Sequence, residues 1–220
     1  MALYVRLEGQ HPHENGPLTH EWICTYNGFS EPLTETDPLS NETQWSYDSC
    51  GNLLTMVDPL NHTVQTNTYD SSGDRLTTKD ALSNQTSFGY DSNGNCTTVT
   101  DPLSNVTTIG YDSLNRLTSV TDPLSNEEQT TYDAWDRVDL ITHPDSTTIS
   151  KAWDNQGNLT SVTDENSHTT SYYYDAAGRL NSTVNARSDT ESYGYDNAGR
   201  RTSVTDGNSH TRNYTFTNRG

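Results

Sequence analysis

The chain of 220 residues has few of the apolar side chains from which a globular core is normally built. Hydrophobic residues make up 29% of it, whereas apolar residues make up about 45–50% of typical domains. Lys and Arg number 12 against 30 Asp and Glu, which gives a formal net charge of −18 at pH 7. Such a composition by itself favours disorder. A folded structure therefore requires that the few apolar residues be regularly placed.

Three further absences restrict the function. Basic residues are scattered and form no cluster, which disfavours nucleic acid as a partner because its binders carry basic patches. No apolar stretch approaches the ~20 residues that span a bilayer, so no membrane insertion is expected. The opening MALYVRLEG lacks the apolar core of a secretory signal. A signal removed during processing, or a non-classical export route, is compatible with it.

What the sequence does contain is a unit of 21 residues that recurs along almost the whole chain. The cleanest copy runs over residues 111–131 and reads YDSLNRLTSVTDPLSNEEQTT. A fixed period of this kind indicates a repeat architecture. One aromatic anchor position recurs at every step of 21, except for a step of 22 between the second and third anchors. The anchors are Tyr26, Tyr47, Tyr69, Tyr90, Tyr111, Tyr132, Trp153, Tyr174, Tyr195 and Phe216.

Two turn signals divide each unit. In the first, Asp follows the anchor and Gly lies four residues after it, as with Asp91 and Gly94. Glycine adopts positive φ without steric cost, so this column predicts a tight turn. The second is Asp-Pro-Leu-Ser-Asn, as at residues 101–105, in which Pro presets φ and Asp bonds the nearby backbone. In the third copy, Asp74 reads as a local insertion that is compensated before Asp80.

The segments between the turns have strand character. Residues 117–121 read LTSVT and are rich in Thr and Val, while Thr107, Ile109 and Tyr111 alternate with the period of two that places side chains on one face of a strand. Leu117 and Val120 are three residues apart, so plain alternation would place them on opposite faces of the strand. Either a bulge or a two-sided environment explains this spacing. The predicted fold is all-β. Tandem 21-residue β-hairpins form a continuous spiralling sheet, or a solenoid or shell segment.

The array does not cover the first residues. Residues 1–15 are out of register and are interpreted as an irregular N-terminal cap or a donated strand, for which LYVRLE has the right alternation. Residues 16–220 contain a half unit, nine units and the start of a tenth. His143 replaces Asp in the most degenerate copy, and the loops at 165–168 and 207–210 lose the Pro-Leu turn. These loops are expected to carry a distinct surface.

The combined pattern of Tyr-Asp, Gly four residues after the anchor, Leu-Thr-x-Val-Thr-Asp and Asp-Pro-Leu-x-Asn resembles the Rhs/YD-repeat family over residues 16–220. The family contains polymorphic toxins, shell components of Tc toxins, wall-associated proteins and teneurins. The resemblance implies β-hairpin strips that spiral into a hollow shell, an extracellular or exported setting, and an association with carbohydrate binding. The chain departs from the family pattern in Ser40, Ser104 and Ser125, where Gly is common, and in lacking the family's self-cleavage motif and a toxin tail.

The sequence evidence for catalytic, metal-binding or modification sites is weaker than the evidence for the repeat. No Gly-x-Ser-x-Gly elbow occurs, so neither catalysis nor a cofactor is predicted. A metal-binding reading of His11, His13, Glu14 and His20 lacks recognised ligand spacing, and the Asp columns are explained by turns. The odd number of cysteines leaves a thiol unpaired whatever the pairing. Asn-x-Ser/Thr sequons make possible glycosylation sites of Asn41, Asn61, Asn84, Asn95, Asn105, Asn158, Asn181 and Asn213.

Three functions are compatible with these observations. The first is a non-catalytic extracellular structural protein, either a shell segment or a self-assembling fibre subunit. The second is a carbohydrate-binding adhesive module at the cell surface, and the third is the casing portion of a polymorphic toxin. The expected partners are copies of the chain itself or the rest of a longer YD-repeat chain, and glycans in the second case. The anchor rings are expected to stack along the array as an interior ladder.

Overall fold

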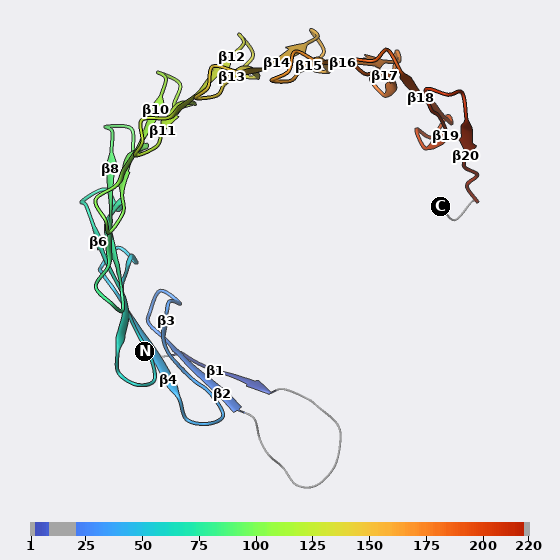
Figure 1. Ribbon diagram of the computed structural model, residues 1–220. Helices are drawn as coiled ribbons and strands as arrows, with labels where there is room; N and C mark the ends of the chain where they lie inside the picture. Colours follow the sequence, from blue (N-terminus) through green and yellow to red (C-terminus); the bar gives the residue numbers. More distant parts are fainter. Residues whose placement is uncertain (1–2, 9–20, 218–220) are drawn as a thin grey trace. The chain divides into compact units, whose positions relative to one another are not determined.

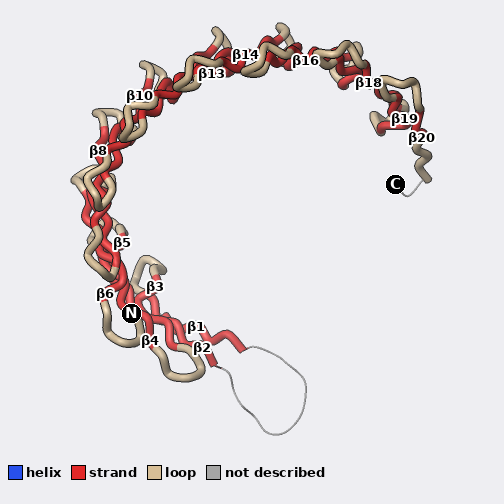
Figure 2. The backbone as a smooth tube through the Cα atoms, viewed as in Figure 1, coloured by secondary structure: helices blue, strands red, loops and turns tan. Residues whose placement is uncertain are grey.

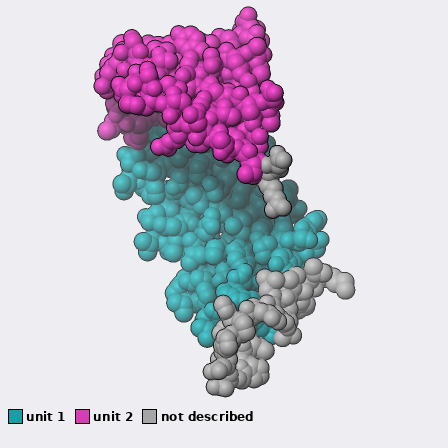
Figure 3. Space-filling view, turned by 90° about the vertical axis from the view of Figure 1, so that its right-hand side faces the viewer, with its two compact units in different colours: residues 1–115 teal, residues 116–220 magenta. Residues whose placement is uncertain are grey.

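The computed structural model describes residues 3–8 and 21–217, and every regular element in this part of the chain is a β-strand (Figures 1 and 2). The described residues contain no helix long and apolar enough to cross a membrane. The all-β prediction is confirmed. Residues 1–115 and 116–220 form two compact units, each of which is described by itself (Figure 3).

The described residues of unit 1, 3–8 and 21–115, contain ten strands. Each pairs antiparallel with the next one in the chain, as in a meander. The strands are β1 (Leu3–Glu8), β2 (Glu21–Tyr26), β3 (Pro32–Thr36), β4 (Glu42–Tyr47), β5 (Leu53–Val57), β6 (Thr63–Tyr69), β7 (Arg75–Asp80), β8 (Gln85–Tyr90), β9 (Cys96–Thr100) and β10 (Val106–Tyr111).

Unit 2 repeats the same meander, again with antiparallel pairing of consecutive strands. Its strands are β11 (Leu117–Thr121), β12 (Glu127–Tyr132), β13 (Val138–Thr142), β14 (Thr148–Trp153), β15 (Leu159–Thr163), β16 (Thr169–Tyr174), β17 (Leu180–Val184), β18 (Thr190–Tyr195), β19 (Arg201–Thr205) and β20 (Thr211–Asn213). Apart from β20, which has three residues, the strands of the two units have five to seven residues.

The two turn signals of the sequence form separate turns that have the same backbone conformation. In the Asp-Pro-Leu turn, Asp101 N donates to Asn105 O at 2.9 Å and Ser104 N to Asp101 O at 3.0 Å. In the glycine turn, Asp91 N donates to Asn95 O at 3.0 Å and Gly94 N to Asp91 O at 3.2 Å. The fourth residue has positive φ in both, 68° at Ser104 and 83° at Gly94. This geometry is the three-residue hairpin loop that closes with a left-handed residue.

Serine at this left-handed position is expected to cost stability. Glycine adopts positive φ freely, whereas a side chain with a Cβ is strained there. Ser104→Gly and Ser125→Gly, whose φ angles are 68°, are each expected to raise the free energy of unfolding by about 0.5–1 kcal/mol. Urea denaturation measures the change. Gly94→Ala is the matched reverse substitution and is expected to lower the free energy of unfolding; equal effects of the three changes would contradict the assignment.

A β-bulge in the first strand of the repeat resolves the spacing of its apolar residues. Across β14 and β15, Ala152 pairs with Ser161 while Trp153 pairs with Leu159, so one extra residue lies between the two pairs. The bulge shifts the alternation by one residue. Leu159 and Val162, three apart, thus lie on one face together with the anchor Trp153. Of the two explanations left open by the sequence, the bulge is the one that the structure contains.

The interpretation of Asp74 as an insertion is wrong. Asp74 is the fifth residue of an ordinary turn, in which Asp70 N donates to Asp74 O at 2.9 Å. The extra residue of the 22-residue step lies instead in β6, which has seven residues and a second register shift opposite Met56 and Val57. Met56 pairs with Gln65 and Val57 with Thr63, so the extra residue is Val64. In the same strand Asn67, only 3% exposed, donates to Leu53 O at 2.9 Å.

Each unit is a single-layer sheet without an enclosed core. Among residues 21–217, only Cys24 and Asn67 are buried, and no large side chain is fully buried. The anchor rings are half-buried, except for the exposed Phe216. The half-buried anchor rings are therefore shielded by their neighbours along the sheet, as expected for an array in which each repeat contacts the adjacent ones.

Candidate functional site

Six of the anchor side chains join their repeat to the backbone of the repeat before it. Tyr174 Oη donates to Leu159 O at 2.9 Å and Tyr195 Oη donates to Leu180 O at 2.8 Å. The indole of Trp153 makes the equivalent bond, since its Nε1 donates to Val138 O at 3.0 Å. The same contact is made by Tyr69, Tyr90 and Tyr132. The hydroxyl or indole N–H of each of these half-buried anchor rings thus provides a hydrogen-bond donor for the backbone carbonyl beside the bulge. Stacking of like anchors into an interior ladder stays a prediction.

Arginine at the fifth turn position adds a second link between repeats. Arg179 Nε donates to Asp175 Oδ2 at 2.7 Å, and its Nη1 donates to Asp196 O of the next glycine-type turn at 3.1 Å. The guanidinium lies over the Tyr195 ring, with Cζ 4.8 Å from the centroid. Planar guanidinium groups suit such combined hydrogen bonding and stacking. The same stacking joins Arg116 to Tyr132, Arg137 to Trp153 and Arg200 to Phe216.

Replacing Arg179 by lysine tests this link. Lysine keeps the charge but has no planar fork, so it cannot hold Asp175, Asp196 O and the Tyr195 ring together. The free energy of unfolding is expected to fall by about 1 kcal/mol. Arg187→Lys, in a turn at the other edge of unit 2, is the matched control and is expected to be neutral. Urea denaturation monitored by circular dichroism measures both; similar losses would contradict the role of Arg179.

The aspartate that opens most of the turns accepts hydrogen bonds from the turn itself. Asp101 Oδ1 accepts from Leu103 N at 2.8 Å and Asn105 N at 2.9 Å, while Oδ2 accepts from Asn105 Nδ2 at 2.8 Å. These hydrogen bonds, that from the Asn105 side chain foremost, lower the pKa of Asp101. The Arg137 side chain lowers the pKa of Asp133 in the same way. The acidic columns are thus explained as turn caps.

Comparison with known proteins rests on this repeat. The family model described as RHS Repeat matches residues 26–63, 69–106, 111–148 and 153–190, which is more than half of the chain. The chain belongs to the Rhs-repeat family. None of the curated proteins compared with the chain matches it.

Solved structures with similar Rhs-repeat architecture come from Tc toxins. The crystal structure of TcdB2-TccC3 matches with a TM-score of 0.67 and 16% sequence identity over 88% of this chain and 12% of that one. The crystal structure of TcdB2-TccC3-TEV matches with a TM-score of 0.66 and 14% identity, over 84% and 11% of the two chains. These similarities show the fold. The chain spans about a tenth of the length of the chains it matches.

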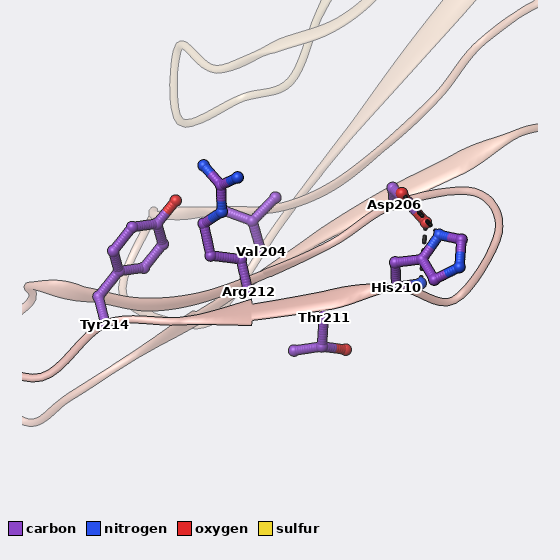
Figure 4. Close-up of a pocket in the computed structure, with 6 residues that line it drawn as sticks. All are labelled: Val204, Asp206, His210, Thr211, Arg212 and Tyr214. Carbon is purple, nitrogen blue, oxygen red and sulfur yellow. Dashed lines mark hydrogen bonds and ion pairs between the residues drawn. The ribbon is translucent and has the colours of Figure 1, made fainter.

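One surface hollow of the Rhs array lies at the hairpin of β19 and β20 (Figure 4). Val204, Arg212 and Tyr214 project from one face of the hairpin and Thr211 from the other. His210 Nδ1 lies 3.3 Å from Asp206 Oδ2 within the same turn. The pair repeats the turn cap seen elsewhere, with His210 in place of the usual Asn. The contact between His210 and Asp206 therefore stabilises the turn.

The predicted glycosylation sites fall on different parts of the Rhs repeat. Asn41, Asn84 and Asn105 are exposed fifth turn residues whose amides donate to the capping Asp. Asn95 and Asn158 make the same bond but are half-buried. Asn61 is the left-handed turn residue, and Asn181 and Asn213 lie exposed on strands. Sequence reasoning missed the capping role of these amides because the sequon pattern coincides with the turn pattern.

Other sequence predictions lie at the start of the chain. His11, His13, Glu14 and His20 are outside the described residues. LYVRLE forms β1, which pairs with β2 of its own chain from Leu3 opposite Tyr26 to Glu8 opposite Glu21.

Two further groups of side chains lie elsewhere in the array. Cys24, Cys50 and Cys96 are free thiols. His143, the residue that breaks the Asp column, is placed between Glu128 and Glu165, at 3.1 Å and 3.4 Å from its two ring nitrogens.

Proposed function

We propose that the chain is a structural strip in the wall of a shell or casing built from Rhs repeats. The observation that carries the proposal is the single-layer sheet, in which no large side chain of residues 21–217 is fully buried. Such a sheet encloses little of its own and gains stability from continuing as a wall. The similarity to TcdB2-TccC3 supports the finer proposal that the casing belongs to a toxin.

The proposed role is non-catalytic and extracellular. Most of the polar residues that resemble catalytic groups are used by the turns, because Asp caps the turn and Asn, Arg or His at the fifth position holds the Asp. Exposed positions carry these residues on both edges of each unit, which suits a solvated wall. The partners of the strip are further Rhs repeats, either of the same polypeptide or of other copies. The domain boundary at residues 15 and 16 belongs to the same proposal.

A second candidate function is carbohydrate binding, which exposed aromatic rings favour. Tyr173 is 53% exposed on β16, on the face opposite the anchors. A flat aromatic ring in solvent is suited to stacking on a sugar. Binding to an array of glycans, lost in Tyr173→Ala and retained in Tyr172→Phe, would support it. The absence of any binding would leave the structural role.

Imaging tests the structural role. The longest natural polypeptide that contains this strip is purified and examined by electron cryomicroscopy. The expected result is that residues 21–217 form part of a wall around a hollow interior. A compact domain with both sheet faces covered, or a strip that stands free of any enclosure, would overturn the proposal.

A further inference from the structure

Two of the turns between residues 21 and 217 open with asparagine instead of aspartate. They are residues 27–31, between β2 and β3, and residues 185–189, between β17 and β18. Both have the backbone hydrogen bonds of the Asp-opened turns, and both end in a carboxylate instead of the Asn, Arg or His of most turns. The amide and the carboxylate have thus exchanged places. Asparagine is a chemically labile residue, so the exchange introduces a reactive group into the turn.

The turn at residues 27–31 polarises the side-chain carbonyl of Asn27. Its Oδ1 accepts hydrogen bonds from Phe29 N at 2.9 Å and from Glu31 N at 3.1 Å. Its Nδ2 donates to Glu31 Oε2. Two N–H groups directed at one carbonyl oxygen stabilise the negative charge that develops there when a nucleophile attacks the carbonyl carbon. The turn therefore favours attack on Cγ of Asn27.

The backbone nitrogen of Gly28 is the nucleophile closest in the chain to that carbon. The other N–H groups of the turn, those of Asn27, Phe29, Ser30 and Glu31, all donate hydrogen bonds. That of Gly28 donates none within the part of the chain that the structure describes. Gly28 is exposed to solvent, and glycine has no side chain to crowd the approach of its nitrogen. Both reacting groups are thus present in one turn.

The second Asn-Gly pair of the chain, Asn93-Gly94, lies in a different setting. Gly94 N donates to Asp91 O at 3.2 Å and so closes its turn. The nitrogen that would have to attack is therefore occupied by a hydrogen bond that defines the turn. The Asn93 amide lies at the exposed tip, where its Nδ2 donates to Asn115 Oδ1 at 3.0 Å. The dipeptide is the same as at Asn27, but its nucleophile is held.

Asn185 provides the converse case. Its Oδ1 accepts from Arg187 N at 2.9 Å and from Asp189 N at 3.0 Å, which repeats the hydrogen bonding of Asn27. The residue that follows it is Ala186, whose Cβ crowds the approach of the nitrogen to the side-chain carbon. Asn185 therefore has the polarised carbonyl without the uncrowded nucleophile.

We propose that Asn27 is a site of spontaneous deamidation, in which the chain supplies the nucleophile and water is the other reactant. Hydroxide takes the proton of Gly28 N, and this nitrogen forms a bond to Cγ of Asn27. The bond from Cγ to Nδ2 breaks, and Nδ2 leaves as ammonia with a proton from water, which restores the hydroxide. Water then opens the cyclic imide at one of its two carbonyls and gives aspartate or isoaspartate.

Either product alters the turn between β2 and β3. Aspartate at position 27 replaces the amide that donates to Glu31 by a carboxylate, so two like charges face each other. Isoaspartate routes the backbone through the former side chain, and Ser30 N then loses the carbonyl of Asn27 to which it donates. The reaction therefore weakens the first hairpin of the array and adds one negative charge to it.

Mass spectrometry of peptides from the full chain, sampled during incubation in mildly alkaline buffer, tests the site. Conversion at Asn27 is expected to be at least about tenfold faster than at Asn93 or Asn185. Gly28→Ala is expected to slow conversion at Asn27 to about the rate of Asn185. A Cβ at Gly28 has no atom within 4 Å, so the alanine fits. The reciprocal change, Ala186→Gly, is expected to accelerate conversion at Asn185. Circular dichroism establishes that both variants remain folded.

The same incubation in urea separates the turn from the dipeptide. In the unfolded chain Asn27 and Asn93 are expected to react at similar rates, because the hydrogen bonds that distinguish them are absent. Conversion of the folded chain that is no faster at Asn27 than at Asn93 would overturn the proposal. A rate at Asn27 that is lower in the folded chain than in urea would overturn it too, since the turn would then protect the amide. So would a rate at Asn27 that Gly28→Ala leaves unchanged.

Discussion

Replacing Trp153 by alanine is expected to lower the free energy of unfolding by about 3 kcal/mol. Trp153 is the half-buried anchor that pairs with Leu159, donates to Val138 O at 3.0 Å and lies under Arg137, whose Cζ is 5.3 Å from the ring centroid. The substitution removes the apolar contact and leaves that carbonyl without its donor. Since each repeat contacts only its neighbours, the loss acts on the repeats on either side.

Two further variants separate the contributions. Trp153→Phe keeps a ring and removes the hydrogen bond, so a loss of about 1 kcal/mol is expected. Trp135→Ala is the matched control, because Trp135 is 65% exposed at a turn tip and also stacks on Arg137. Its effect is expected to be within about 0.5 kcal/mol. Urea denaturation followed by circular dichroism measures all three, and equal losses at the two tryptophans would contradict the anchor role.

Acid is expected to unfold the array steeply, because its turns depend on ionised aspartates. Hydrogen bonds within the turn lower the pKa of the capping carboxyls. The affected residues are Asp37, Asp48, Asp58, Asp80, Asp91, Asp101, Asp122, Asp133, Asp154, Asp164, Asp175, Asp196 and Asp206. Hydrogen bonds from Thr147 also lower the pKa of Asp145, the third residue of the turn that His143 opens.

The direction of the pH effect follows from these lowered pKa values. A carboxyl whose pKa is lower in the folded state stabilises that state fully above its ordinary range, near pH 4, and the stabilisation is lost as pH falls through the folded pKa. The melting temperature is therefore expected to be constant above about pH 5 and to fall steeply below about pH 4. Protonation also removes repulsion from the net charge of −18, which acts in the opposite direction.

Thermal melting at a series of pH values measures which effect dominates. A variant with Asn at Asp101 and Asp122 keeps a capping side chain but cannot titrate there, so its melting temperature is expected to fall less between pH 5 and pH 3 than that of wild type. A melting temperature that rises on acidification would show that charge repulsion outweighs the caps, and would contradict their proposed importance.

The period of 21 residues is enough to predict most of the fold. The alternation at Thr107, Ile109 and Tyr111 sets strand faces, and the Asp and Gly columns set the turns, because both follow from local sterics and local hydrogen bonds. The identity of the two turns is harder to predict. Ser104 adopts the same left-handed conformation as Gly94, yet serine carries no signature of positive φ, so the sequence presents two turn types where the structure has one.

The sequence by itself determined an all-β repeat array, its period and its turn positions, since these depend on interactions within about one repeat. The tertiary structure decided how the repeats are joined. The bulge at Leu159, the bond from Trp153 to Val138 O and the stacking of Arg179 on Tyr195 all link residues 15 or more apart or on paired strands. The same holds for the hydrogen bond from Asn67 to Leu53 O. Such contacts depend on strand register and on which side chains share a face, and spacing along the chain does not specify either once a bulge shifts the alternation.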